Sequence, residues 1–283
     1  MTKKLPSKYK LQKKIMDSIK SIPPMNQVID RARKVIENPD SSFEELATLI
    51  EKDQALAVNV LKIANSAYYR RVNAASSIKE AVVVLGFETL DELITIACVS
   101  PHLHKRLKGY DIKADSVWWH SLASASGAKM IAHMIDPSFE NEAFTAGLIH
   151  DVGKLVLDRY VYERKDIFQE HMSDDQVTFY DAEKLILGFD HAEIAEKICK
   201  KWNFPKGITT AIKYHHNPWA SRNNELSYIV HASDQIAAWA EIGAEDLMLD
   251  ISDELLERLG LKTDDVEQII VEVTKCADNI VEK

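Results

Sequence analysis

Residues 143–154 read AFTAGLIHDVGK, a run of small and apolar residues that ends in an adjacent histidine and aspartate, His150 and Asp151. The spacing of the apolar side chains predicts a helix over about residues 142–158. Imidazole and carboxylate groups are the usual protein ligands of zinc, iron, manganese and related divalent ions. The stretch therefore predicts a helical protein with a candidate metal site.

The rest of the chain repeats this helical periodicity, with nine glycines and eight prolines among 283 residues and no sustained two-residue alternation. Ser42 with Glu45, and Ser77 with Glu80, match the capping box that begins a helix. Gly86 offers a left-handed stop after the second of these boxes. Further helices are predicted over about residues 53–64, 89–99, 177–187 and 191–202, in segments that end near 135 and 216, and around 231–234. We expect an all-α fold.

The length favours two helical units, because single hydrophobic cores stop growing above about 250 residues. Histidine and tryptophan first appear together at Trp118-Trp119-His120, which indicates a boundary near residue 113. We expect an N-terminal extension (1–19), an N-terminal helical bundle (20–113) packed on a second helical domain (114–240), and a helical C-terminal segment (241–283). This last segment either closes the second domain or docks on a partner.

The net charge of −9 is unevenly distributed, since residues 241–283 hold thirteen acidic and four basic residues and account for all of it. A neutral body with an acidic end lacks the clustered basic surface that nucleic acids require, so direct binding to them is disfavoured. No apolar run approaches the length of about 20 residues needed to cross a membrane, and the start resembles no secretory signal. We expect a cytoplasmic protein that does not bind membranes.

Six of the ten histidines are candidates for a functional site, and all six lie in the second domain: His120, His150, His191, His215, His216 and His231. Asp151 and Asp234 accompany them. Several histidines that converge in a folded core need a cation to offset their crowding, so metal binding is the natural hypothesis.

At these residues the sequence resembles a known family. The stretch 143–154 is similar to the signature of HD-superfamily metal-dependent phosphohydrolases, in which adjacent histidine and aspartate bind metal. Asn65-Ser-Ala-Tyr-Tyr69 and Val84-Leu-Gly86 resemble the N-terminal half of HDOD domains, which are HD relatives associated with bacterial signalling and regulation. The resemblance covers roughly residues 20–240 and implies that 20–113 is an HDOD subdomain and 114–240 an HD-type domain.

The resemblance implies a metal set of one or two divalent ions, such as iron, manganese or zinc. A first ion would be held by His120, His150, Asp151 and Asp234. A second would add His191 and His215, with Asp151 bridging the two. Asp151 and Lys154 are the candidate catalytic residues, and Lys154 would contact either a phosphate oxygen or a ligand carboxylate.

Plainer interpretations remain open for several residues. His191 follows Asp190, which with Glu193 forms a capping box, so His191 could simply occupy a first helical turn. Neighbouring residues of a helix point about 100° apart, which favours His215 as ligand and leaves His216 beside the ligands or facing a substrate. His231 is either a partner of the site or a surface residue. Four of the tryptophans, Trp118, Trp119, Trp202 and Trp219, are expected in the core.

Two features distinguish the sequence from cyclic-dinucleotide phosphodiesterases of the HD-GYP type. The paired histidines are followed by Asn217-Pro218-Trp219-Ala220, and Ser116 stands where relatives with a third metal carry a carboxylate. HDOD domains often have incomplete ligand sets. We therefore expect a signalling or regulatory protein with a metal site, which binds a signalling protein, a nucleotide or another phosphoester. An active metal-dependent phosphohydrolase is the first alternative, and a di-iron oxygenase the second. Oligomeric state is not predicted.

Overall fold

The computed structural model describes residues 8–22, 31–32, 34–36, 38–69, 74–173, 177–242 and 251–281. Within these ranges the chain is helical and contains no strand; the β-type pairing there is an isolated bridge between Leu107 and Ile112. The all-α prediction is confirmed. None of the described helices combines the length and apolarity needed to span a membrane.

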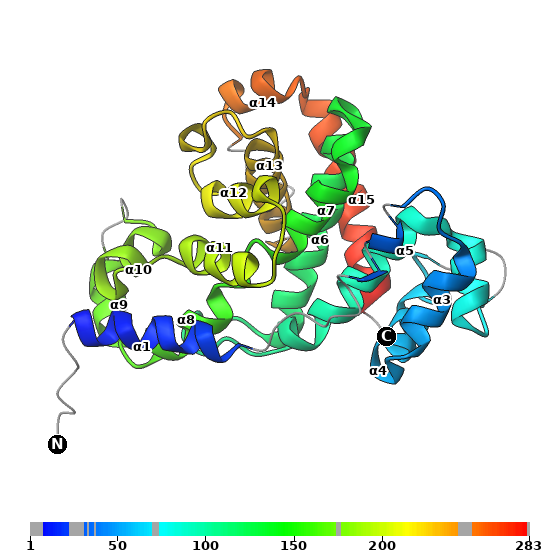
Figure 1. Ribbon diagram of the computed structural model, residues 1–283. Coiled ribbons are helices and arrows are strands. Elements are labelled where there is room, and N and C mark those ends of the chain that lie inside the picture. The colour runs from blue at the N-terminus through cyan, green and yellow to red at the C-terminus, as the bar shows by residue number, and fades with distance from the viewer. Residues whose placement is uncertain are drawn as a thin grey trace.

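Three helices form one end of the molecule (Figure 1): α3 (Phe43–Glu51), α4 (Gln54–Ala64) and α5 (Ile78–Leu103). Ser42 and Ser77 each accept a hydrogen bond from the main-chain N–H three residues on, as the capping patterns predict. Gly86 interrupts α5 with a φ of 79° and a ψ of 171°, a positive-φ kink that glycine tolerates, in place of the left-handed stop that was expected. The capping residues therefore set where these helices begin.

The larger part of the molecule is built around α6 (Ala114–Ile135) and α7 (Glu140–Ile149), which pack side by side at its centre (Figure 1). The remaining helices are α8 (Lys154–Tyr162), α9 (Lys165–His171), α10 (Phe179–Leu187), α11 (His191–Lys201), α12 (Lys206–Tyr214), α13 (Glu225–Ile242), α14 (Asp253–Leu259) and α15 (Thr263–Val281). Short 3₁₀ turns cover Pro137–Phe139 and Pro218–Ser221.

The helix predicted over residues 142–158 is in fact two helices, and that prediction was wrong in this respect. α7 ends at Ile149 and α8 begins at Lys154, so the His150-Asp151 doublet lies in the turn between them. Gly153 allows this turn to press against the start of α11: a Cβ atom at Gly153 would lie 1.9 Å from the carbonyl oxygen of His191. The break therefore brings the doublet next to His191. α9 was not predicted.

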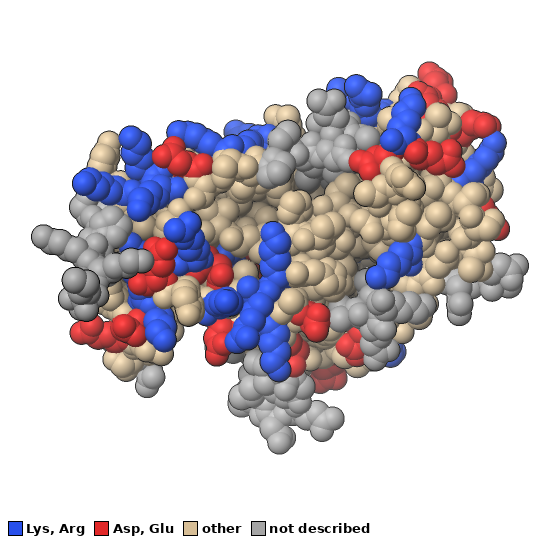
Figure 2. Space-filling view, turned by 90° about the horizontal axis from the view of Figure 1, so that it is seen from below, with Lys and Arg blue, Asp and Glu red and all other residues tan. Residues whose placement is uncertain are grey.

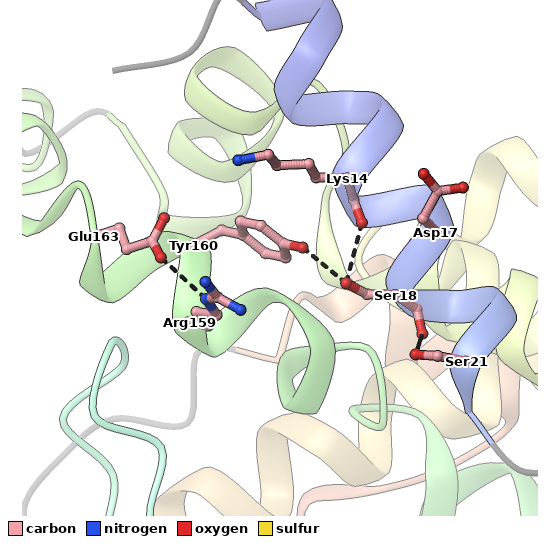
Figure 3. Close-up of a pocket in the computed structure, with 7 residues that line it drawn as sticks. All are labelled: Lys14, Asp17, Ser18, Ser21, Arg159, Tyr160 and Glu163. Carbon is pink, nitrogen blue, oxygen red and sulfur yellow. Dashed lines mark hydrogen bonds and ion pairs between the residues drawn. The ribbon is translucent and has the colours of Figure 1, made fainter. Parts of the chain in front are cut away.

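The first described helix, α1 (Lys8–Ser21), lies along α8, α10 and α11 (Figure 1). The Oγ atom of Ser18 and the hydroxyl of Tyr160 are 2.7 Å apart, and Lys201 of α11 donates to the main-chain oxygens of Lys20 (2.6 Å) and Ile22 (2.5 Å). Figure 3 shows the polar cavity of about 330 Å³ that remains between α1 and α8. Hydrogen bonds thus attach α1 to α8 and α11 of the larger helical body.

The last described helix, α15, packs along α6 and α13. Its apolar face is buried, and Cys276 contacts Ser126 of α6 at 2.9 Å. Gly127 of α6 faces α15, and a Cβ atom there would lie at van der Waals distance, 3.4 Å, from Val273. Of the two alternatives for residues 241–283, the described part, 251–281, packs onto this larger helical body.

An ion pair with a buried carboxylate joins α5 of the N-terminal helices to α6 of the larger helical body. Glu92 of α5 is 3% exposed, pairs with Lys129 of α6, and accepts a hydrogen bond of 3.2 Å from the hydroxyl of Tyr69. Tyr69 belongs to the Asn65–Tyr69 motif, which therefore supports this junction. On the face drawn in Figure 2, basic and acidic side chains are interspersed beside a broad uncharged area.

Candidate metal centre

The six residues of the predicted metal set come from five separate helices or their ends. His120 lies on α6, His150 and Asp151 follow α7, His191 begins α11, His215 follows α12 and Asp234 lies on α13. Their side chains converge in the interior, and His150 and His215 have no exposed surface. The structure therefore brings all six together.

One group of ligand atoms surrounds Asp234. Its Oδ1 atom lies 3.0 Å from Nε2 of His120 and 3.3 Å from Nε2 of His150, and His150 Nε2 is 3.5 Å from Oδ2 of Asp151. The donor atoms of His120, His150 and Asp151 fall within 4.8 Å of one another, as do those of His150, His215 and Asp234. Such spacing suits a single cation.

A second group consists of His191, His215 and His216, whose donor atoms also fall within 4.8 Å of one another. Nε2 of His216 is 2.7 Å from Nε2 of His191. Helical geometry favoured His215 over His216 as a ligand and left His216 beside the ligands or facing a substrate, but α12 ends at Tyr214 and the paired histidines lie beyond it. His216 therefore joins the group. Asp151 connects the groups, with its Oδ1 atom 3.3 Å from His191 Nε2.

Hydrogen bonds to the other ring nitrogen orient three of these imidazoles. Nδ1 of His150 donates to the carbonyl of Gly147, and Nδ1 of His215 donates to the carbonyl of Ile212, both at 2.7 Å. Nδ1 of His191 donates to the carboxylate of Glu183 at 2.7 Å. A proton held on Nδ1 leaves Nε2 to act as the ligand atom, and all three Nε2 atoms face the cluster.

The electrostatic balance of the cluster depends on its two aspartates. Burial alone would raise the pKa of Asp151, but Lys154, His150 and His191 outweigh it and hold this pKa well below its usual value. Burial likewise opposes the charge of His150, yet Asp151 and Asp234 raise its pKa to about 9. Burial, together with neighbouring histidines, lowers the pKa of His215 well below its usual value. His215 is thus a neutral imidazole.

Three buried polar atoms in the cluster have no hydrogen-bond partner: Nε2 of His150, Oδ1 of Asp151 and Nε2 of His215. Their nearest polar neighbours, at 3.3 Å for the first two, do not meet hydrogen-bond geometry. A buried polar atom left unpaired costs about 1–3 kcal/mol. Because all three are imidazole nitrogen or carboxylate oxygen atoms in one cluster, a divalent cation would satisfy them together. The residues present fit the implied metal.

The remaining predicted site residues are also placed. Lys154 donates to Oδ2 of Asp151 at 2.5 Å, which is the carboxylate contact foreseen as one of its two roles. His231 is partly buried and donates from Nδ1 to the carbonyl of His215 at 2.5 Å, so it supports a cluster residue. Trp118 and Trp202 are buried as expected, whereas Trp219 is 44% exposed and its expected core position was wrong.

One residue in contact with the cluster was not found from the sequence. Glu183 of α10 is completely buried and accepts hydrogen bonds from both the main chain and the ring of His191. A lone glutamate on an otherwise amphipathic helix gives no sequence signal of this kind. The cavity between α1 and α8 is not part of the centre, and its Arg159 pairs with Glu163 at 3.0 Å (Figure 3).

Comparison with known proteins places the chain in a family. Its sequence matches the HDOD domain over residues 22–218. A curated relative, an uncharacterized protein of Treponema pallidum (strain Nichols), is 26% identical over 209 residues. That alignment covers 74% of this chain but only 40% of the relative's length.

Solved structures share the fold. An HDOD domain protein of unknown function from Geobacter sulfurreducens superposes with a TM-score of 0.76 at 24% identity, covering 97% of this chain and 98% of the other. A protein of Shewanella amazonensis SB2B, described as a candidate phosphohydrolase, gives 0.75 at 22% identity, covering 95% and 97%. A candidate signal transduction protein of Marinobacter aquaeolei VT8 gives 0.71 at 22% identity, covering 98% and 66%.

The chain is therefore an all-helical protein with a histidine–aspartate cluster that could bind metal, and it belongs to the HDOD domain family.

Proposed function

We propose that this protein is a metal-binding regulatory protein, in which the cluster holds up to two divalent ions and the N-terminal helices contact a partner. The observation that carries the proposal is the convergence of His150, Asp151 and His215, each of which has a buried donor atom that makes no hydrogen bond. A first ion would be held by His120, His150, Asp151 and Asp234. A second would be held by His191, His215 and His216, with Asp151 between the ions.

The partner-binding part of the proposal is supported by the surface of α3–α5. Val58, Val83 and Val84 expose 60%, 61% and 49% of their surface, and Tyr68 exposes 48%. The three valines lie on α4 and α5 and Tyr68 lies between these helices, and exposed apolar side chains can contribute to an interaction surface. The similarity to a candidate signal transduction protein agrees with this function.

The first test is metal analysis of the purified full chain. We expect one or two equivalents of divalent metal, and a loss of more than about tenfold in bound metal for His150→Ala. His133→Ala is the matched control, because His133 lies on α6 but is exposed and pairs only with Glu140. A wild-type protein without affinity for zinc, manganese or iron would refute the proposal.

Metal loading is expected to depend on pH in a defined direction. With a pKa of about 9, His150 is protonated at neutral pH in the ion-free protein, and an ion can use its Nε2 atom only after the proton leaves. Affinity should therefore rise with pH, by about tenfold per unit between pH 6 and 8 if one proton is displaced. Calorimetry in buffers of different ionisation enthalpy would measure the proton released. Affinity that is constant from pH 6 to 8 would contradict the assignment of His150.

Phosphoester hydrolysis is the second candidate, and the partial exposure of the cluster favours it. The side chains of His120, Asp234 and Lys154 keep 15%, 17% and 21% of their surface exposed, so a small substrate could reach them. Two bound metal ions would supply Lewis-acid activation of a phosphate and of water. Lys154 would bring a positive charge beside the bound phosphate.

A screen of phosphoesters and cyclic nucleotides, with and without manganese, tests this candidate. Hydrolysis that disappears in Asp151→Asn while helical content is retained would promote the enzyme over the purely regulatory protein. A mixed-valence iron signal from the purified protein would favour a di-iron oxygenase instead.

A further inference from the structure

Glu183 is a completely buried carboxylate whose two oxygens both accept hydrogen bonds. Its Oε2 atom accepts from the main-chain N–H and from Nδ1–H of His191, each at 2.7 Å. Its Oε1 atom accepts from the hydroxyl of Tyr110. Asp190 caps α11, and Glu183 of α10 holds the first residue of that helix and fixes how its ring is rotated.

His191 differs in this respect from the other deeply buried histidines of the cluster. Nδ1 of His150 and of His215 donates to neutral main-chain carbonyls, whereas His191 donates to a carboxylate. The Nδ1 atom of His120 is 3.9 Å from Glu241, beyond hydrogen-bond distance. A carboxylate behind an imidazole increases its strength as a metal ligand and locks its orientation.

Tyr110 completes this arrangement from another part of the chain. It lies in the turn closed by the bridge between Leu107 and Ile112, and its ring packs on Phe179 of α10 at 5.0 Å. Burial and the neighbouring Glu183 raise the pKa of Tyr110 well above its usual value, so its hydroxyl keeps the proton that it donates. Glu183 is thereby held from both sides.

We propose that Glu183 and Tyr110 are positioning residues that prepare His191 to bind the ion of the group His191, His215 and His216. The inference rests on the proposed metal-binding function and deepens it. Since Glu183 touches none of the residues around Asp234, the ion of that first group should not depend on it.

The experiment is a titration of the full chain with Zn²⁺ against a competing chelator. For Glu183→Gln we expect one ion to bind about 10- to 100-fold more weakly and the other to bind as in the wild type. Tyr110→Phe should weaken the same ion to a smaller extent. Glu163→Gln is the control, because Glu163 is exposed at the end of α8 and pairs with Arg159.

Ring ¹⁵N spectra of the histidines identify which ion is affected. In Glu183→Gln at limiting Zn²⁺, His191 should lose its metal-bound Nε2 signal while His120 and His150 retain theirs. Equal weakening of both ions would indicate a merely structural role and overturn the inference, as would unchanged binding of both. A wild-type chain that binds one ion only would also overturn it while leaving metal binding intact. A wild-type chain that binds none would refute the proposed function itself.

Discussion

Replacing Asp151 with asparagine is expected to abolish metal binding and to destabilise the ion-free protein by about 3–5 kcal/mol, the usual effect of removing one partner of a buried ion pair. Asp151 is 9% exposed and lies 2.5 Å from Lys154 and 3.3 Å from His191. Without its charge, the part-buried Lys154 and the buried, protonated His150 both lose a carboxylate partner. With its charge, the Asp151 carboxylate can contact both groups of ligands, the one around Asp234 and the one of His191, His215 and His216.

Urea unfolding of chelator-treated protein measures the first effect, and metal analysis measures the second. Because the native pKa of Asp151 is lowered, its stabilising contribution is present at neutral pH and is lost as the pH falls below its unfolded value of about 4. The wild type and Asp151→Asn should therefore converge in stability in acid. Asp166→Asn is the control, since Asp166 is exposed on α9. A variant as stable as the control at pH 7, with metal bound, would contradict the role assigned to Asp151.

Gly153→Ala is expected to have the second large effect. A Cβ atom at this position would lie 1.9 Å from the carbonyl oxygen of His191 and 2.8 Å from the main-chain nitrogen of Ala195. Neither atom can move without displacing α11, so we expect a loss of about 3 kcal/mol or more. Since α11 begins with His191, the displacement should also separate His191 from Asp151 and weaken metal binding.

Gly207→Ala provides the comparison, because a Cβ atom there would meet its nearest neighbours at an ordinary 3.7 Å. Gly207 lies in the first turn of α12, where alanine is a better helix former. This variant should be as stable as the wild type or slightly more so. If thermal unfolding and metal content of Gly153→Ala equal those of Gly207→Ala, then the contact between the doublet turn and α11 is not required.

Local sequence signals predicted helix boundaries well where one side chain determines them. Ser42 and Ser77 cap helices as expected, and Gly86 adopts a positive φ angle. These features depend on contacts within about four residues, so they can be recognised without knowledge of the fold. The division of the predicted helix over 142–158 depends instead on α11, which lies 40 residues further along the chain.

The candidate metal centre shows the same contrast between features that the sequence predicts and features that depend on distant packing. The resemblance to HD proteins identified six residues that the fold brings together, because the order of ligands along the chain is itself a signal. The orientation of His216 depends on where α12 ends, and the role of Glu183 depends on the packing of α10 against α11. Neither can be obtained from residue spacing alone.

The ion pair of Glu92 and Lys129 has a consequence for dissecting the molecule. Lys129 and His120 both lie on α6. They are about 14 Å apart along the helix axis, because an α-helix rises 1.5 Å per residue. Separating α3–α5 from α6 would leave the buried Glu92 carboxylate without its cation. The helices that bear the exposed valines and the helices that bear the histidines are therefore coupled through this pair, and we expect α3–α5 expressed alone to be less stable than the same helices in the whole chain.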